Sequence, residues 1–422
     1  MLPPYVRKYL ESRAISGPWK ITGNEPGGFD GAVIIPALAE SNDLFFTLQS
    51  LAQNPEEILS RFLILVVVNH RDDAPLSQKS DNEHTLRRLA TDDPSLRGLQ
   101  LAWVNAASKG FELPAKRGVG LARKIGLDLA LPCLNYGEAA PPLISLDADT
   151  LVRPDYLPAL IRHFQERTAP GAVIPFCHRA GSSPDQDKAI RRYELFLRAY
   201  VLGLSRAGSP YAFHTVGSAM ACLAESYARM GGMNLRVAGE DFYFLEHLAK
   251  TGGISQVKGT VVYPSARASN RVPFGTGRSV SRLLDEEKGA VLFYQTGCFQ
   301  ILRDWLTLVP QNLDLEGEDI RVEAEGISVD LATYLDNIRF TAVWGKLREN
   351  FRARSTLMSG FHAWFDGLKT MKLIHHLSAR PLPRGEPENI MTGFLQWAGL
   401  EPVEGIDNQL DLLRKIQIGG AY

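Results

Sequence analysis

Cysteine is scarce in this sequence, and the cysteines present follow no pairing pattern. The 422 residues contain four, with neither a CxxC pair nor the spacing of a zinc site. We therefore expect neither a disulfide scaffold nor a zinc centre. Each cysteine has apolar neighbours, which predicts buried free thiols and fits a reducing compartment. The four are Cys133, Cys177, Cys222 and Cys298.

Long hydrophobic runs are also missing. The longest, residues 62–68, is typical of a buried strand and is far shorter than the ~20 residues that a membrane-spanning helix needs. The first residues, Met1–Tyr5, lack the apolar core of a signal peptide. We expect a soluble, cytoplasmic protein without a transmembrane segment.

Neither sign of charge is in excess. Lys and Arg total 46 and Asp and Glu total 47, so the net charge is −1. Such a balance creates no global field for nucleic acid, which we exclude as a partner, and any phosphate-binding site must be local. Hydrophobic residues make up 45% of the chain, which is enough for a large core. A chain of 422 residues is too long for one small domain.

Strand-like and helical segments alternate through the first part of the chain. This alternation predicts an α/β fold with a largely parallel sheet. Ligands of such sheets bind beyond the carboxyl ends of the strands, so the polar residues that follow each strand are the candidates for function. Strands are expected at 32–36, 62–68, 99–104 and 143–146, and helices at 42–53 and 118–131.

The chain divides into three parts by pattern. Residues 1–30 are expected to form an N-terminal arm, and residues 31–284 the α/β domain. Residues 285–422 are expected to be mainly helical, because apolar residues recur at helical spacing over 331–351 and 357–377.

Two acids follow the last expected strand directly. Asp147 and Asp149 are one residue apart, so both side chains can turn toward one point. Hard cations such as Mg²⁺ and Mn²⁺ prefer carboxylate oxygens and keep positions open for phosphate oxygens. The pattern predicts a divalent metal site at Asp149 and Asp147. A turn in which aspartate caps the next helix is the competing interpretation.

Several segments resemble family 2 glycosyltransferases, and they occur in that family's order. Residues 33–40 resemble its opening strand and loop, and residues 121–127 its Ala-Arg-Asn-x-Gly helix. Residues 147–149 are similar to its DxD motif, 231–233 to its Gly-Gly-Phe loop and 239–242 to its Glu-Asp motif. The ordered set is more specific than any single motif, and it spans most of the α/β domain.

The resemblance implies a GT-A fold, in which a Rossmann-like nucleotide-binding sheet is joined to an acceptor-binding half. It implies transfer of one sugar from a nucleotide-sugar donor to a hydroxyl acceptor that the sequence does not identify. Pro36, Ala37 and Glu40 would lie beside the nucleoside. An acid after the second strand would meet the base, and either Asp72 or Asp73 fits that place.

The resemblance also assigns roles to the acids. Asp147 would lie near the ribose and the metal, and Asp149 would bind Mn²⁺ or Mg²⁺, which neutralises charge on the leaving diphosphate. Asp241 would be the general base, supported by Glu240, and in-line attack would invert the anomeric centre. Acids that stabilise a helix N-terminus are the alternative at this position, because a helix is expected from Phe242.

Basic residues near these motifs are candidates for the donor phosphates. We predict that Arg123, in the motif helix, and Arg271 bind the donor. Arg271 belongs to an arginine-rich segment, 265–279, that also contains Arg267 and Arg278 and could place a guanidinium on the diphosphate. Arginines in water on a surface loop are the alternative.

Two other functions stay open. The family usually has Tyr and Asn where this chain has Leu38 and Ala39, which keeps alive a catalytically inactive binding or scaffold protein on the same fold. A sugar-nucleotide pyrophosphorylase would show a Gly-rich, basic loop after the first strand, and residues 37–40 are not of that kind. The helical C-terminal region is interpreted either as a cover over the acceptor cleft or as a homo-oligomer surface.

Overall fold

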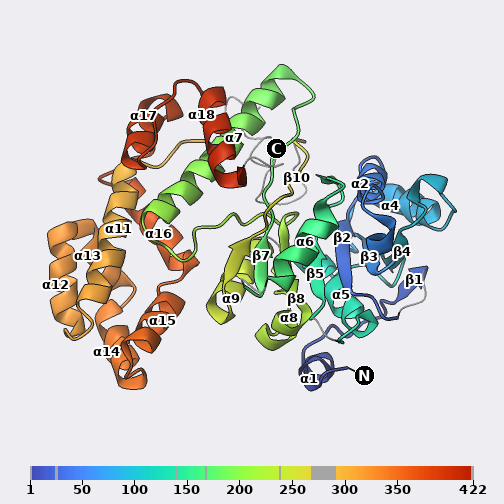
Figure 1. Cartoon of the computed structure of the whole chain (residues 1–422), viewed down its shortest axis with the longest axis horizontal. Coiled ribbons are helices and arrows are strands. Elements are labelled where there is room, and N and C mark those ends of the chain that lie inside the picture. Colours follow the sequence, from blue (N-terminus) through green and yellow to red (C-terminus); the bar gives the residue numbers. More distant parts are fainter. Residues whose placement is uncertain are drawn as a thin grey trace. The chain divides into compact units, whose positions relative to one another are not determined.

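The computed structural model describes residues 2–23, 27–137, 140–166, 169–236, 239–267 and 291–419. The chain forms two compact units, shown in Figure 1. The first contains Met1–Ile190, Thr215–Leu284 and Lys415–Tyr422, and the second contains Arg191–His214 and Asp285–Arg414.

The first unit is built on an eight-stranded sheet with the order β1-β4-β3-β2-β5-β8-β7-β9. Strands β4, β3, β2 and β5 are parallel to one another, whereas β8 is antiparallel to both of its neighbours. The strands are β1 Ile21–Gly23, β2 Gly31–Ala37, β3 Phe62–Asn69, β4 Gln100–Ala106, β5 Pro142–Ser145, β7 Gly171–Val173, β8 Met220–Leu223 and β9 Ile254–Gln256.

Burial explains why the central strands form where they do. Every residue of β2 and of β3 is buried, and both strands are rich in β-branched side chains that pack well in a covered sheet. Pro36 lies in β2 past Ile34, the last β2 residue paired with β5, so its missing N–H leaves no bond of that ladder unmade. The pairing of β2 with β5 ends at Ile34, and the loops of the candidate site begin beyond it.

Helices cover this sheet, and a small two-stranded sheet of β6 (Leu151–Val152) and β10 (Val262–Tyr263) accompanies it. Helix α5 packs on β2 and β3. A Cβ at Gly126 of α5 would lie 2.5 Å from Ile34, so only glycine permits this close approach. The helices are α1 Pro4–Ser12, α2 Leu44–Leu51, α3 Glu56–Leu59, α4 Leu76–Leu89, α5 Val119–Ala130, α6 Tyr156–Gln165, α8 Ala224–Met230 and α9 Glu240–Thr251.

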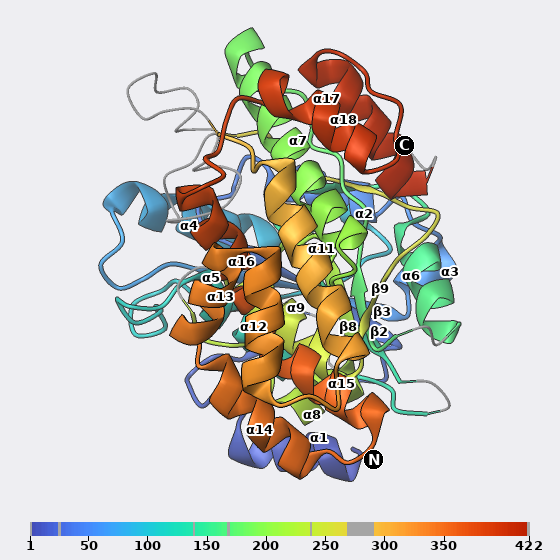
Figure 2. The same ribbon diagram turned by 90° about the vertical axis from the view of Figure 1, so that its left-hand side faces the viewer.

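The second unit is helical. Its helices surround one core in which the fully buried Trp305 contacts the rings of Phe340, Phe361 and Phe365. Figure 2 shows α11, α12, α13 and α16 side by side. The helices are α11 Thr296–Gln311, α12 Gly317–Ile327, α13 Val329–Asn337, α14 Phe340–Asn350, α15 Arg354–Trp364, α16 Gly367–Ala379, α17 Pro387–Trp397 and α18 Ile406–Arg414.

Helix α7, Pro184–Arg206, belongs to both units: its first turns are part of the first unit, and the helix continues from Arg191 into the second. The chain then returns to the first unit at Thr215. After α18, a short π-helical segment, Lys415–Gly419, is again part of the first unit.

The predicted fold class is confirmed. The first unit has an α/β fold in which strands β4, β3, β2 and β5 are parallel, and the C-terminal region is mainly helical. Among the helices that the structure describes, none combines the length and the apolar character that a membrane crossing requires. All four cysteines are buried and free.

Candidate functional site

The carboxyl ends of β2, β3 and β5 lie at one edge of the sheet because the three strands are parallel. The loop after β2 contains Glu40, and the loop after β5 contains Asp147 and Asp149. Asn69, the last residue of β3, donates through Nδ2 to the Ala37 carbonyl oxygen at 3.1 Å and so ties β3 to the end of β2. The sheet therefore brings together the first motif and the DxD-like motif.

The loop after β2 is held in an unusual backbone conformation. Ala39 has a φ of 54°, in the left-handed region that alanine rarely occupies. Its N–H donates to Asn82 Oδ1 at 2.9 Å, and the N–H and hydroxyl of Ser41 donate to Asp81 at 3.1 and 2.6 Å. Helix α4, which carries Asp81 and Asn82, therefore fixes the loop that positions Glu40.

Arg123 on α5 is the buried centre of a polar cluster, called here the Arg123 cluster: Arg123, Ser145, Asp147 and Glu240. Its guanidinium, 3% exposed, forms short ion pairs with Asp147 and with Glu240. Its Nε donates to Ser145 Oγ at 3.0 Å, and that hydroxyl donates to the Gly217 carbonyl oxygen at 2.9 Å. One cation thus joins the DxD-like motif to the Glu-Asp motif.

Two glycines leave room for this cluster. A Cβ at Gly217 would lie 2.3 Å from Arg123 Nη2, which the ion pairs hold in place. A Cβ at Gly120 would lie 2.6 Å from the carbonyl oxygen of Arg236, in the segment before α9, and 3.2 Å from Glu240 Cβ. The Gly120 position thus lets the start of α5 approach the start of α9 closely.

The acids at the start of α9 hold their protons unusually tightly. Burial raises the pKa of Glu240 to about 7, although Arg123 opposes the shift, and the neighbouring Asp241 adds to it. Desolvation also raises the pKa of Asp241. The Asp241 carboxylate accepts a hydrogen bond from the Phe242 N–H at 2.8 Å. A raised pKa suits a carboxylate that takes a proton near neutral pH.

These shifts predict a pH-dependent stability. Between pH 4.5, the ordinary Glu pKa, and pH 7, the folded chain binds more protons at Glu240 than the unfolded chain does. The free energy of unfolding is therefore expected to fall as pH rises through this window. Gln cannot ionise, so the stability of Glu240→Gln relative to wild type is expected to rise between pH 4.5 and pH 8.

Urea unfolding at a series of pH values measures this difference. Glu57→Gln, at an exposed position of α3, is the matched control and is expected to stay near wild type throughout. A stability difference between Glu240→Gln and wild type that does not change between pH 4.5 and pH 8 would contradict the prediction.

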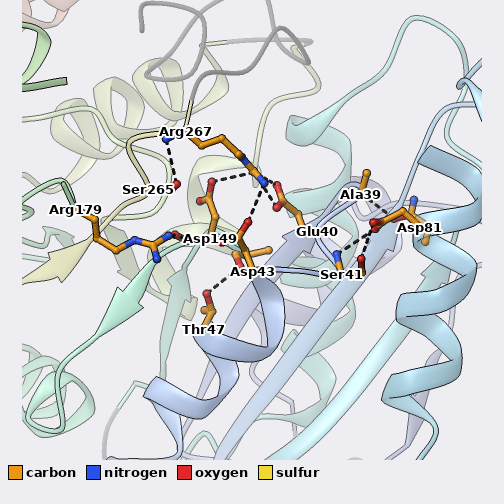
Figure 3. A network of polar contacts seen from close by, with 12 residues as sticks. Ala39, Glu40, Ser41, Asp43, Thr47, Asp81, Asp149, Arg179, Ser265 and Arg267 are labelled. Carbon is orange, nitrogen blue, oxygen red and sulfur yellow. Dashed lines mark hydrogen bonds and ion pairs between the residues drawn. The ribbon is translucent and has the colours of Figure 1, made fainter. Parts of the chain in front are cut away.

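A second cluster, called here the Arg267 cluster, consists of Glu40, Asp43, Asp149 and Arg267 (Figure 3). Arg267 Nη2 donates to both carboxylate oxygens of Glu40 at 2.8 Å and to Asp149 Oδ2 at 3.2 Å. Its Nη1 donates to Asp43 Oδ2 at 2.9 Å. Arg179 donates to the backbone carbonyl oxygen of Asp149 at 2.9 Å. The first motif and the DxD-like motif therefore meet on one guanidinium.

The other candidates lie apart from these clusters or outside the described residues. Asp72 and Asp73 are exposed in the loop after β3, and Asp73 forms an ion pair with Arg71 at 3.0 Å. Asp72 Oδ1 accepts the Asp73 N–H at 2.7 Å, so the choice between them stays open. Arg271 and Arg278 lie outside the described residues.

The carboxylates fit a metal that is shared with a substrate. Within the described ranges, no three His, Cys, Asp or Glu side chains are placed to hold a metal ion together. Mg²⁺ commonly takes only one or two protein carboxylates and fills its other positions with phosphate oxygens and water. Asp149, whose side chain is a quarter exposed, offers such a ligand, although it also contacts Arg267 at 3.2 Å; Asp147 forms an ion pair with Arg123.

Sequence reasoning missed part of the site. Asp43 follows Glu40 by three residues, and that spacing at a helix start was the one signal that could have marked it. No sequence signal points to Arg179, or to the role of Asp81 and Asn82 on α4. No sequence signal predicts that the guanidinium of Arg123 lies among Ser145 and two acids; binding of the donor by Arg123 stays a prediction.

Comparisons with known proteins find likeness only among solved structures. No protein-family model and no curated protein matches the sequence. S. aureus TarS 1–349 in complex with UDP-GlcNAc is 14% identical, with 72% of this chain and 90% of that chain covered and a TM-score of 0.38. Mannosyltransferase PcManGT from Pyrobaculum calidifontis in complex with GDP-Man and Mn²⁺ is 14% identical, with 98% and 92% covered and a TM-score of 0.38. M. tuberculosis glucosyl-3-phosphoglycerate synthase is 14% identical, with 69% and 87% covered and a TM-score of 0.32.

Proposed function

We propose that the chain is a glycosyltransferase that moves one sugar from a nucleoside-diphosphate sugar to a hydroxyl acceptor, with a divalent metal and with inversion. The observation that carries the proposal is the Arg123 cluster. Asp147 and Glu240 are 93 residues apart in the sequence (240 − 147), and one buried guanidinium holds both carboxylates. Acids that served only as a turn and a helix start would not need to converge on a shared cation.

The acids have separate roles in this proposal. Asp149 would hold a divalent ion together with the donor phosphates, and that ion would neutralise the charge that develops on the leaving diphosphate. Asp241 would accept the proton of the acceptor hydroxyl, because its neighbour Glu240 is already engaged by Arg123. Arg123 would keep Glu240 and Asp147 in register and leave both the metal ligand and the base outside its own ion pairs.

The donor side of the site follows from the loop after β2. Pro36 and Ala37 end β2 at the edge of the sheet where the loop after β5 also lies. Glu40, three residues further on, binds Arg267. A nucleoside placed over Pro36 and Ala37 would direct its diphosphate toward Asp149. The exposed Asp72 and Asp73, after the adjacent strand β3, are candidates to meet the base.

Thermal stabilisation tests this function directly. We expect one nucleoside diphosphate from a panel of UDP, GDP, ADP, CDP and dTDP to raise the melting temperature, and only when Mn²⁺ or Mg²⁺ is present. A ligand at a hundred times its Kd stabilises the folded state by about 2.7 kcal/mol, which is readily measured. Asp149→Ala is expected to abolish the shift, because it removes the ligand that the metal shares with the phosphates.

The matched control is Asp92→Ala, which removes an exposed acid of the same unit and is expected to retain the full shift. If no nucleotide stabilises the wild-type chain under any condition, the donor site is wrong and the scaffold interpretation takes its place.

A further inference from the structure

Arg267 contacts the carboxylate of Asp149, where a bound metal ion would be a second positive charge. Its guanidinium contacts carboxylates from two loops: Glu40 and Asp43 after β2, and Asp149 after β5. Figure 3 shows the Arg267 side chain directed at all three. Asp149 is also the residue proposed to bind the metal, so the same carboxylate would bind both Arg267 and the metal ion.

The three contacts of Arg267 are unequal. Glu40 accepts from Nη2 through both oxygens at 2.8 Å, and its side chain is only 10% exposed, so this charge-assisted contact is close and largely shielded from water. The contact with Asp149 is the longest, at 3.2 Å. Arg267 can therefore lose Asp149 and keep Glu40 and Asp43.

A second arginine lies near Asp149. Arg179 reaches the backbone carbonyl oxygen of Asp149, and its nearest approach to an Asp43 oxygen is 3.8 Å. The Asp149 carboxylate itself contacts Arg267. Two cations that share one carboxylate at this distance repel each other, and partial burial strengthens the repulsion.

We propose that Arg267 and the divalent metal compete for Asp149, so that the chain supplies its own counter-ion to the metal-binding carboxylate. Without metal, Arg267 neutralises Asp149; metal bound at Asp149 displaces the guanidinium, which stays on Glu40 and Asp43. This inference rests on the proposed function, because it takes Asp149 to be the metal ligand. It adds a built-in penalty on metal binding that donor phosphates would help to overcome.

Titration with Mn²⁺ alone, followed by electron paramagnetic resonance of the free ion, tests the competition. Arg267→Gln is expected to bind Mn²⁺ about tenfold more tightly than wild type, because the competing charge is gone. Arg267→Lys keeps the charge but loses the planar guanidinium, so it is expected to tighten Mn²⁺ binding less than Arg267→Gln does. Arg179→Gln is the comparison: Arg179 contacts the backbone of Asp149 and lies 3.8 Å from Asp43, so its removal is expected to change the affinity less than Arg267→Gln does.

The outcomes separate this inference from the function it rests on. If every variant binds Mn²⁺ with wild-type affinity, or if Arg267→Gln binds it more weakly, the competition is refuted while the metal site stands. If Arg267→Gln and Arg267→Lys tighten binding equally, charge is not the cause and the proposal fails. If neither wild type nor Arg267→Gln binds Mn²⁺, even with the nucleoside diphosphates of the thermal panel, the metal-dependent function and the inference fall together. Melting temperatures of the variants show that each one is folded.

Discussion

Asp241→Asn is expected to lower the rate of sugar transfer by about 10²- to 10⁴-fold, the range that a positioned general base contributes. The acceptor hydroxyl is a weak nucleophile, and an amide cannot take its proton. Nucleotide binding should survive, because Asp241 lies at the start of α9 and not among the residues proposed to hold the donor. The measurement is the steady-state kcat with the nucleotide sugar whose diphosphate stabilises the chain, beside the thermal shift of the same variant.

The neighbouring acid provides the control. Glu240 is engaged by Arg123, so Glu240→Gln is expected to reduce kcat less than Asp241→Asn does. Because desolvation raises the pKa of Asp241, wild-type activity is expected to rise with pH as this carboxyl loses its proton. Full activity in Asp241→Asn combined with loss of activity in Glu240→Gln would show that Glu240, and not Asp241, is the general base.

Arg123→Met is expected to lower the free energy of unfolding by about 3–5 kcal/mol, the usual cost of removing one partner from a buried ion pair. Methionine fills much of the space of the arginine stem but leaves the Glu240 carboxylate buried without its cation, and Asp147 loses the same partner. Urea unfolding at pH 8, where Glu240 is ionised in wild type, measures the effect. Arg87→Met, at an exposed position of α4, is the matched control and is expected to change stability little.

A double variant identifies the cause. If the loss in Arg123→Met comes from uncompensated charge, Arg123→Met with Glu240→Gln should recover a large part of it, because the amide needs no counter-ion. The two changes would then be strongly non-additive, as expected for residues in direct contact. A single variant within 1 kcal/mol of wild type would mean that the Arg123 cluster contributes little to the folded state.

The core strands and the edge that holds the site could be predicted, because they depend on local pattern. The run at 62–68 is β3 with one further residue, Asn69, and Asp147 and Asp149 do follow β5. The ion pairs of Arg123 could not be predicted, because the sequence pattern places Arg123 only on a helix; its role in donor binding stays a prediction. Its burial depends on Ser145 and Glu240, which only the folded chain brings to it.

Ala39 shows why a departure from the family pattern can be misleading. Because alanine stands here in place of the usual Asn, the sequence left open the interpretation that the chain is a catalytically inactive scaffold protein. The structure has φ of 54° there, a conformation that Asn tolerates better than alanine does. Asn82 and Asp81 on α4 hold the loop at Ala39 and Ser41. The loop thus has a backbone conformation that asparagine would favour, and contacts from α4 support it.

Residues 415–419 return to the first unit, so the first unit depends on a segment that is synthesised after the second unit. Ile418 packs against Cys177 and Val261, and Gln256 Nε2 donates to the Gln417 carbonyl oxygen at 2.6 Å. A nascent chain leaves the ribosome from its amino end, so most of the eight-stranded sheet can assemble early. This corner of the first unit must stay open until the ribosome has also released Arg414, the last residue of the second unit. The first unit is therefore completed only after the whole second unit has been synthesised.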